Sequence, residues 1–253
     1  MSALAIGAIV FACVFGGAVF GMFLGTILPE DHLSPDARDV IKVAMAMIAT
    51  LAALVLGLLI ASANSSLDEK EGELRSTAAQ VVLLDRTMAE YGAETKEARD
   101  LLKQTTAARI SQIWPEENAN VTPSAIGRGS GIEAIQRKLL DLSPQTDAQR
   151  WLQSTALQIS GTIAGARWSA LEQIGSSIQW PFMTILVFWL AIIFTSFGVF
   201  APRNASVTAA LFVAALSVAG SVYLILEMDQ PYSGAIKISS APLRTALEQL
   251  GRP

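Results

Sequence analysis

The segment IKVAMAMIATLAALVLGLLIASANS, residues 41–65, carries a single charged side chain, Lys42, near its start. A helix needs about 20 apolar residues to cross a hydrocarbon core of about 30 Å, and this segment is long enough. Three stretches without any charge, residues 1–28, 181–202 and 204–226, meet the same requirement. The lipid core admits only helices and closed barrels, and unbroken apolar blocks lack the alternation of a barrel. The sequence therefore predicts four transmembrane helices.

The composition agrees with a membrane protein and argues against several other classes. Hydrophobic residues make up 52% of the chain, charged residues only 16%, and the mean hydropathy is +0.44. The first apolar block lacks a basic start and a small-residue cleavage site, so we do not expect a signal peptide. A net charge of -4 and a pI near 5.1 give no reason to expect nucleic-acid binding.

A polar section of helical character separates the second and third hydrophobic blocks. In residues 68–114 apolar side chains recur at seven-residue spacing, which predicts one long amphipathic helix ending at Trp114 and Pro115. Residues 131–142 and 144–179 also have helical patterns. We therefore expect an all-α, polytopic membrane protein in which a long cytoplasmic helical hairpin joins the second and third transmembrane helices.

This pattern divides the chain into four parts. They are the first two membrane helices (1–66), a cytoplasmic helical domain (67–179), the last two membrane helices (180–227) and a cytoplasmic tail (228–253). Within the tail, residues 236–240 are β-prone and residues 242–250 predict a small amphipathic helix. Basic residues flanking the membrane segments indicate that both termini face the cytoplasm.

Glycines at four-residue spacing form the sharpest pattern in the first membrane segment: Gly17, Gly21 and Gly25. Such a ladder forms a groove that lets the backbone of another helix approach closely in lipid. The second membrane segment offers a matching ladder at Ala53, Gly57 and Ala61. Tight packing within one subunit is one interpretation, and a contact between subunits or a pore-lining face is the other.

One face of the second membrane segment combines apolar and polar residues. Spacings of three and four place six residues on this face: Met47, Thr50, Leu54, Gly57, Ala61 and Asn64. In a ring of subunits the face would line a pore, with a hydrophobic constriction at Leu54 that gates by dewetting. In an isolated helical bundle the same face would be core.

Ionisable residues avoid the middle of the membrane segments, which argues against a proton-coupled transporter or pump. Glu227 and Asp229, at the end of the fourth helix, could contact a cation because hard cations prefer oxygen ligands. A solvated helix end is the alternative explanation. No catalytic motif or phosphate-binding loop occurs, and one cysteine (Cys13) and one histidine (His32) cannot form a His/Cys zinc site. We expect no enzyme activity, cofactor or bound metal.

Two stretches resemble the bacterial bestrophin-like membrane proteins. One is AALVLGLLIA, residues 52–61, followed by an acidic amphipathic helix. The other is EMDQPYSG, residues 227–234, followed by PLRTALEQL, residues 242–250, and its Asp-x-Pro-x-x-Gly turn is the most specific motif. The resemblance extends over nearly the whole chain and implies a multi-pass protein of the bacterial inner membrane.

The resemblance also implies a homo-oligomer, a tetramer or pentamer, in contact with the lipid bilayer and with ions. True bestrophins are pentameric anion channels whose second helix lines the pore and whose calcium-binding acids follow the fourth helix. Glu227 and Asp229 occupy a similar place. Bestrophin pores are lined partly by phenylalanine, whereas residues 41–67 contain no aromatic residue, so the channel mechanism does not transfer residue by residue.

Two functions follow from these observations. The first is an oligomeric inner-membrane protein that forms an ion channel or small-solute pore lined by the second transmembrane helix. The second is a non-conducting membrane scaffold or sensor whose cytoplasmic helical domain binds a partner.

Overall fold

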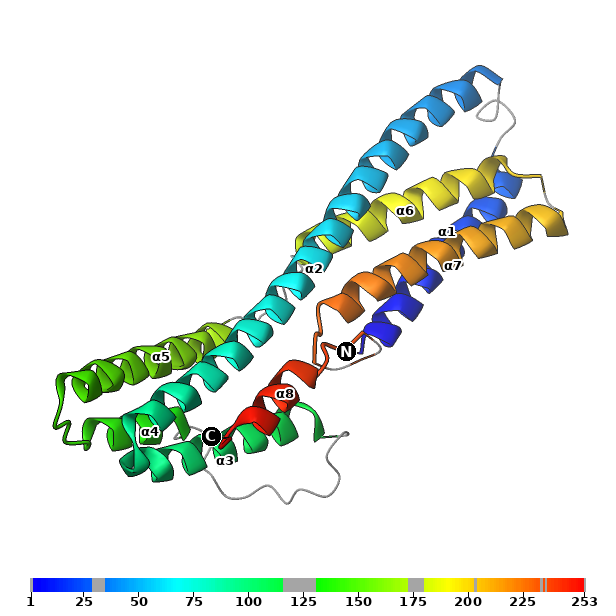
Figure 1. Cartoon of the computed structure of the whole chain (residues 1–253). Coiled ribbons are helices and arrows are strands. Elements are labelled where there is room, and N and C mark those ends of the chain that lie inside the picture. The colour runs from blue at the N-terminus through cyan, green and yellow to red at the C-terminus, as the bar shows by residue number, and fades with distance from the viewer. Residues whose placement is uncertain are drawn as a thin grey trace. The chain divides into compact units, whose positions relative to one another are not determined.

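The computed structural model describes residues 2–28, 35–115, 131–172, 180–202, 204–232, 234 and 236–252. Over these residues the protein is all-α, with eight α-helices and one short 3-10 helix (Figure 1). Two compact units are present. The membrane unit comprises Met1–Leu67 and Ser176–Ile236, and the polar unit comprises Asp68–Gly175 and Lys237–Pro253.

Four of the described helices are long and apolar enough to cross a membrane, as the sequence predicts. They are α1 (Ala3–Ile27), α2 (Pro35–Tyr91), α6 (Trp180–Phe200) and α7 (Ala205–Met228). Polar side chains cap the N-terminal ends of α1 and α7: the Ser2 hydroxyl accepts from the Ala5 N–H, and the Asn204 side chain accepts from the Val207 N–H. The all-α class and the four apolar helices therefore agree with the sequence analysis.

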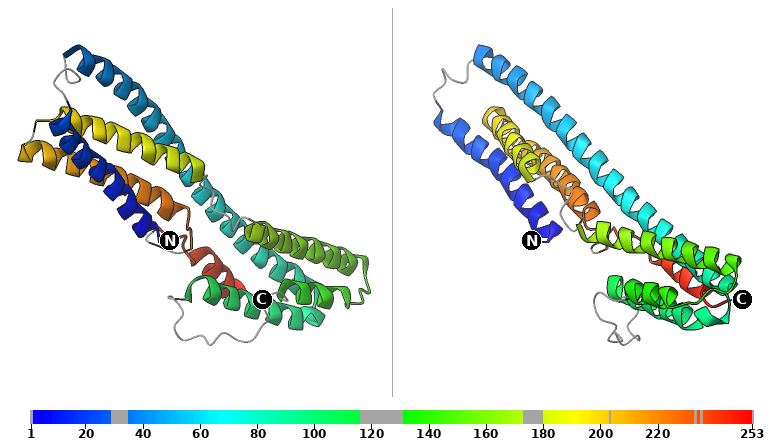
Figure 2. Two further views of the ribbon diagram at one scale, coloured as in Figure 1. Left: turned by 180° about the vertical axis from the view of Figure 1, so that it is seen from behind. Right: turned by 90° about the vertical axis from the view of Figure 1, so that its left-hand side faces the viewer.

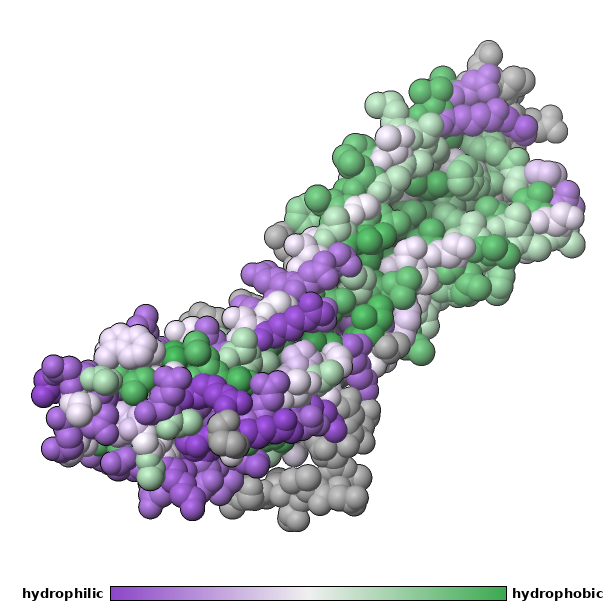
Figure 3. Space-filling model, viewed as in Figure 1, coloured by the Kyte–Doolittle hydropathy of each residue, from purple (hydrophilic) through white to green (hydrophobic). Residues whose placement is uncertain are grey.

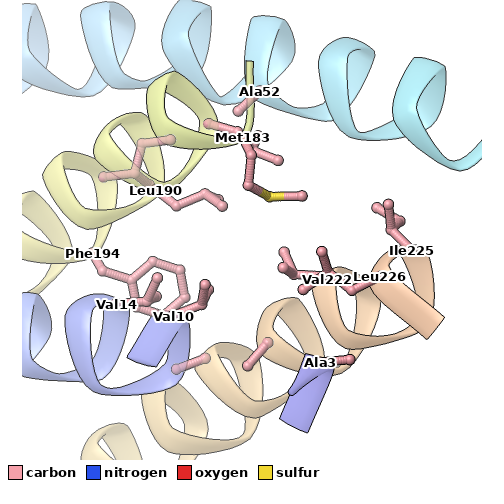
Figure 4. Packing of buried hydrophobic residues seen from close by; sticks show 14 of the residues in the cluster. Ala3, Val10, Val14, Ala52, Met183, Leu190, Phe194, Val222, Ile225 and Leu226 are labelled. Atoms are coloured by element: carbon pink, nitrogen blue, oxygen red, sulfur yellow. The ribbon is translucent and has the colours of Figure 1, made fainter. Parts of the chain in front are cut away.

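The central helix of the membrane unit is α1, which packs against both α6 and α7. Figure 2 shows these three helices running alongside one another in two further views. The Val10 and Val14 side chains of α1 lie beside Phe194 of α6 in the buried core (Figure 4). On the α7 side, the Phe11 and Phe212 rings meet edge to face with centroids 5.3 Å apart. These three helices thus form the centre of one core, to which α2 also contributes buried residues.

The polar unit begins with the C-terminal part of α2, which ends at Tyr91. Gly92 follows with φ +137°, a conformation that glycine adopts without steric cost. The Thr95 hydroxyl donates to the carbonyls of Met88 and Gly92 and fixes the turn. A 3-10 helix (Ala93–Thr95) then leads into α3 (Lys96–Ile113). The prediction of one continuous helix over residues 68–114 is therefore wrong, because the chain reverses at Gly92.

The other helices of the polar unit are α4 (Gly131–Leu140), α5 (Asp147–Glu172) and α8 (Ala241–Gln249). Their apolar faces share a core with α2 and α3, which includes Leu84, Leu102, Ile135, Ile159 and Leu250. The middle section is thus more than a two-helix hairpin, and the tail packs with it because Leu243 and Leu250 need to be buried. The β-prone residues 236–240 form no strand.

A buried ion pair holds the last described residues of the tail. The Asp85 side chain is 1% exposed, and its carboxylate accepts from Nε and Nη2 of Arg99 at 2.8 and 3.0 Å. The Gly251 N–H donates to the same carboxylate at 3.1 Å, and Arg99 donates to the Arg252 carbonyl at 3.2 Å. Hydrogen bonding to Asp85 raises the pKa of the Arg99 guanidinium. The tail is therefore anchored through polar contacts as well as apolar burial.

Candidate pore-lining face of α2

In the membrane unit, one side of α2 packs on the core and the other side is exposed. The packed side is centred on Ala52 and Ala63, which are 3% and 2% exposed, with Ile48 and Leu59 partly buried against the core. In its most apolar stretch only 6% of residues are buried, against 28 to 33% in the other three apolar helices. Among these helices, α2 is therefore the one least covered by its own chain.

All six residues of the predicted pore-lining face lie on the exposed side of α2. Met47 and Leu54 are 66% and 70% exposed, and Thr50, Gly57, Ala61 and Asn64 are exposed as well. Within one chain this face is therefore not core, which removes one of the two interpretations that the sequence left open. Its partner must be lipid, water or another polypeptide.

The face offers few polar groups at membrane depth. The Thr50 hydroxyl donates to the Ala46 carbonyl at 2.9 Å, so its proton is satisfied within the helix while its oxygen can still accept. A side chain at Gly57 would meet nothing within 4 Å, so the backbone is open there. The surface is thus mostly smooth and aliphatic.

The exposed side of α2 differs in kind from the exposed sides of the other apolar helices. Those helices present seven large aromatic side chains: Phe20, Phe23, Trp180, Phe182, Phe188, Phe197 and Phe212. In the part of α2 that belongs to the membrane unit, the large exposed side chains are all non-aromatic: Val40, Val43, Met47, Leu51, Leu54, Leu58 and Ile60. Figure 3 shows the hydrophobic surface of the membrane unit. Small residues are enriched where membrane helices contact each other, so Gly57 and Ala61 favour a protein partner for this face.

The glycine ladder of α1 packs against α6 of the same chain. A Cβ at Gly17 would lie 3.0 Å from the Ala191 carbonyl oxygen, and one at Gly25 would lie 2.7 Å from that of Val199. A Cβ at Gly21 would overlap the Thr195 carbonyl. The matching partner is thus α6 rather than α2, and Ala53 lies on the exposed side of α2. Sequence reasoning missed the partner, although the small residues Ala191, Thr195 and Gly198 recur at spacings of four and three.

The two acidic residues at the end of α7 have different surroundings. Glu227 is 8% exposed, and the Tyr223 hydroxyl donates a hydrogen bond to its carboxylate. Gly234, at φ +103°, lies so close that a Cβ there would overlap the Glu227 carboxylate. Asp229 caps α7 and is half-buried. In the part of the chain that the structure describes, no three His, Cys, Asp or Glu residues group into a metal site, and His32 lies outside that part.

The burial of Glu227 was not predicted from the sequence. Its signal is the Asp-x-Pro-x-x-Gly turn, in which Gly234 lets the chain fold back over the end of α7.

Comparison with protein-family models matches the bestrophin-like domain to residues 12–243. No curated protein matches the chain, and no solved structure does.

Proposed function

The chain belongs to the bestrophin-like family, and we propose that it forms a homo-oligomer in which α2 lines a pore for ions or small solutes. The observation that carries the proposal is the exposed, uncharged face of α2 from Met47 to Asn64. A tetramer or pentamer with cyclic symmetry would bring identical α2 faces around one axis.

The chemistry of the face suits a hydrophobic gate. Leu54 lies near the middle of the apolar part of α2 and projects a large side chain that is 70% exposed. A ring of such side chains excludes water when narrow and conducts when widened, as in pores that gate by dewetting. Gly57 and Ala61, about one and two turns further along, leave room for copies of α2 to approach closely.

The proposal also includes the orientation of the chain in the membrane and its contacts with ions. We place the protein in a bacterial inner membrane with both termini in the cytoplasm, which a reporter fused to the N-terminus tests by its accessibility in intact cells.

Glu227 and Asp229 would offer carboxylate oxygens to a cation at the end of α7. Because Glu227 already bonds Tyr223, cation binding would have to compete with that bond.

A single-cysteine experiment tests the pore. In a Cys13→Ala background, Leu54→Cys places one thiol on the proposed lining, and Phe188→Cys places one on the exposed side of α6. In planar bilayers a charged thiol reagent is expected to block the current through the Leu54→Cys protein and to leave the Phe188→Cys protein unaffected. Absence of conductance from intact oligomers across varied salt, pH and membrane tension would contradict the proposal. Equal block of both variants would show that α2 does not line the pore.

A second candidate function rests on α5. Trp151 and Trp168 of this helix are 66% and 62% exposed, and no charged residue occurs between positions 151 and 166. Aromatic side chains are enriched at protein interfaces relative to the rest of the surface. A non-conducting scaffold would use the exposed residues of α5 to bind a partner. Such a scaffold would carry no current, and Trp151→Ala would abolish partner retention by the full-length protein.

A further inference from the structure

A cavity of about 390 Å³ lies in the membrane unit where α1 and α6 end and α2 begins. Its described lining includes the apolar side chains of Met22, Val199, Phe200 and Pro202. Among the described residues of the lining, Arg38, in the first turns of α2, is the charged one. The volume falls within the range of about 300 to 1,000 Å³ that is common for small-molecule sites.

The Arg38 guanidinium is held over an aromatic ring. Its central carbon lies 5.7 Å from the centroid of Phe200, the distance of a cation–π contact. Stacking occupies a face of the guanidinium and leaves its N–H edges directed to the surroundings. The neighbouring carboxylate of Asp39 bonds Lys42 instead, at 3.1 Å. Among the residues that the structure describes, Arg38 forms no ion pair.

One stacked guanidinium beside apolar side chains suits an amphiphile with a charged headgroup. Arginine binds phosphate oxygens bidentately, and the apolar side chains beside it can contact the hydrocarbon part of a lipid, which a free phosphate lacks. The ends of apolar membrane helices lie at the level of the lipid headgroups, and α1 and α6 both end at this cavity. We propose that the cavity binds the phosphate headgroup of an anionic lipid, with Arg38 as the phosphate ligand and Phe200 as the residue that positions it.

A simpler explanation of Arg38 is that its side chain only extends its charge into water at the membrane surface, without binding a specific ligand. Such a residue would attract all anionic surfaces equally and would be replaceable by lysine. The proposed site differs in two ways: it depends on the stacked, planar guanidinium, and it depends on the space beside it. Both differences can be measured.

The test uses the full chain purified in detergent and delipidated, with lipid binding followed by native mass spectrometry. Phosphatidylglycerol and phosphatidylcholine are titrated separately, and inorganic phosphate is added as a competitor. Arg38→Gln removes the proposed ligand. Lys42→Gln is the matched control, because it removes the same charge one turn further along α2 from a residue outside the cavity lining.

We expect Arg38→Gln to weaken phosphatidylglycerol binding at least tenfold, Lys42→Gln to change it less than twofold, and Arg38→Lys to restore only part of it. Ala201→Phe, which fills the cavity and keeps the charge, is expected to lower binding as well. Equal loss in Arg38→Gln and Lys42→Gln would overturn the site in favour of general surface attraction. Equal binding of phosphatidylcholine would remove the role of the anionic headgroup, and displacement by millimolar phosphate would assign the cavity to the free anion instead.

Discussion

At the scale of single residues, Asp85 carries a charge in a place that water does not reach. Its side chain is 1% exposed, whereas that of its partner Arg99 is 21% exposed. Removing one partner of a buried pair leaves the other charge without compensation, which costs about 3–5 kcal/mol when both are buried. Since Arg99 can regain water, a smaller cost is expected here.

We expect Asp85→Ala to lower the free energy of unfolding by about 2–3 kcal/mol, because it also removes the acceptor of the Gly251 N–H. The measurement is denaturant unfolding of the purified protein, followed by far-ultraviolet circular dichroism. Glu71→Ala is the control, since its pair with Arg75 is exposed and worth less than about 1 kcal/mol. Equal effects of the two substitutions would show that the Asp85 pair contributes no more than a surface contact.

A second residue-scale prediction concerns Glu97, whose carboxylate accepts from the Lys138 amine at 2.6 Å. This hydrogen bond lowers the pKa of Glu97 below its usual value. Since the folded-state pKa is depressed, the stabilisation is present above the ordinary glutamate pKa and is lost as the pH falls through the lowered value. Carboxyl NMR titration of the Lys138→Met variant is expected to show the pKa of Glu97 returning upward. An unchanged value would mean that the contact does not persist in solution.

At the scale of secondary-structure elements, the close approach of α1 and α6 depends on glycines. Gly21→Ala is expected to destabilise the protein by about 1–3 kcal/mol, the usual cost of overpacking, because the new Cβ would overlap the Thr195 carbonyl. Gly16→Ala is the matched control on the same helix, where a Cβ meets nothing within 4 Å. Thermal unfolding in detergent compares the two. A Gly21→Ala protein as stable as Gly16→Ala would show that the helices separate readily.

The four apolar helices were predictable because length and lack of charge are sufficient signals for a membrane segment. The reversal at Gly92 was not, because the seven-residue apolar repeat continues through Met88 and Thr95 without a gap. A single glycine costs a helix only about 1 kcal/mol, so it does not by itself predict a break. The hydrogen bonds from Thr95 to the carbonyls of Met88 and Gly92 stabilise the reversal, and they exist only in the folded chain.

The candidate site was predictable to a similar extent. Helical spacing was sufficient to place Met47, Leu54 and Ala61 on one face of α2. Spacing alone does not tell whether that face is buried, since core and lining positions recur at the same period. The structure answers this question for one chain, because the core side of α2 is centred on Ala52 and Ala63.

At the scale of the whole molecule, the proposed ring of subunits predicts an effect of Gly57→Leu that the structure of a single chain does not predict. Gly57→Leu is expected to leave helix content unchanged, since a side chain there meets nothing within 4 Å in the single chain. In a ring of α2 helices the same side chain would hold the copies apart, so the oligomer is expected to dissociate or to stop conducting. Gly16→Leu, at an exposed glycine of α1, serves as the control.

Light scattering coupled to size-exclusion chromatography measures the mass of each Gly57 and Gly16 variant, with the detergent contribution subtracted. An intact oligomer with normal conductance in Gly57→Leu would place this part of α2 away from any contact between copies. Loss of the oligomer in Gly16→Leu alone would assign the contact to α1.

The anchoring of the tail also matters for how the protein is handled in the laboratory. Leu250 is 3% exposed, and the backbones of Gly251 and Arg252 are bonded to Asp85 and Arg99. A purification tag or fluorescent protein joined directly after these residues would disturb the hydrogen bonds between this backbone and the Asp85–Arg99 pair. Fusions are better made at the other terminus, or through a long flexible spacer, if the labelled protein is to behave like the native one.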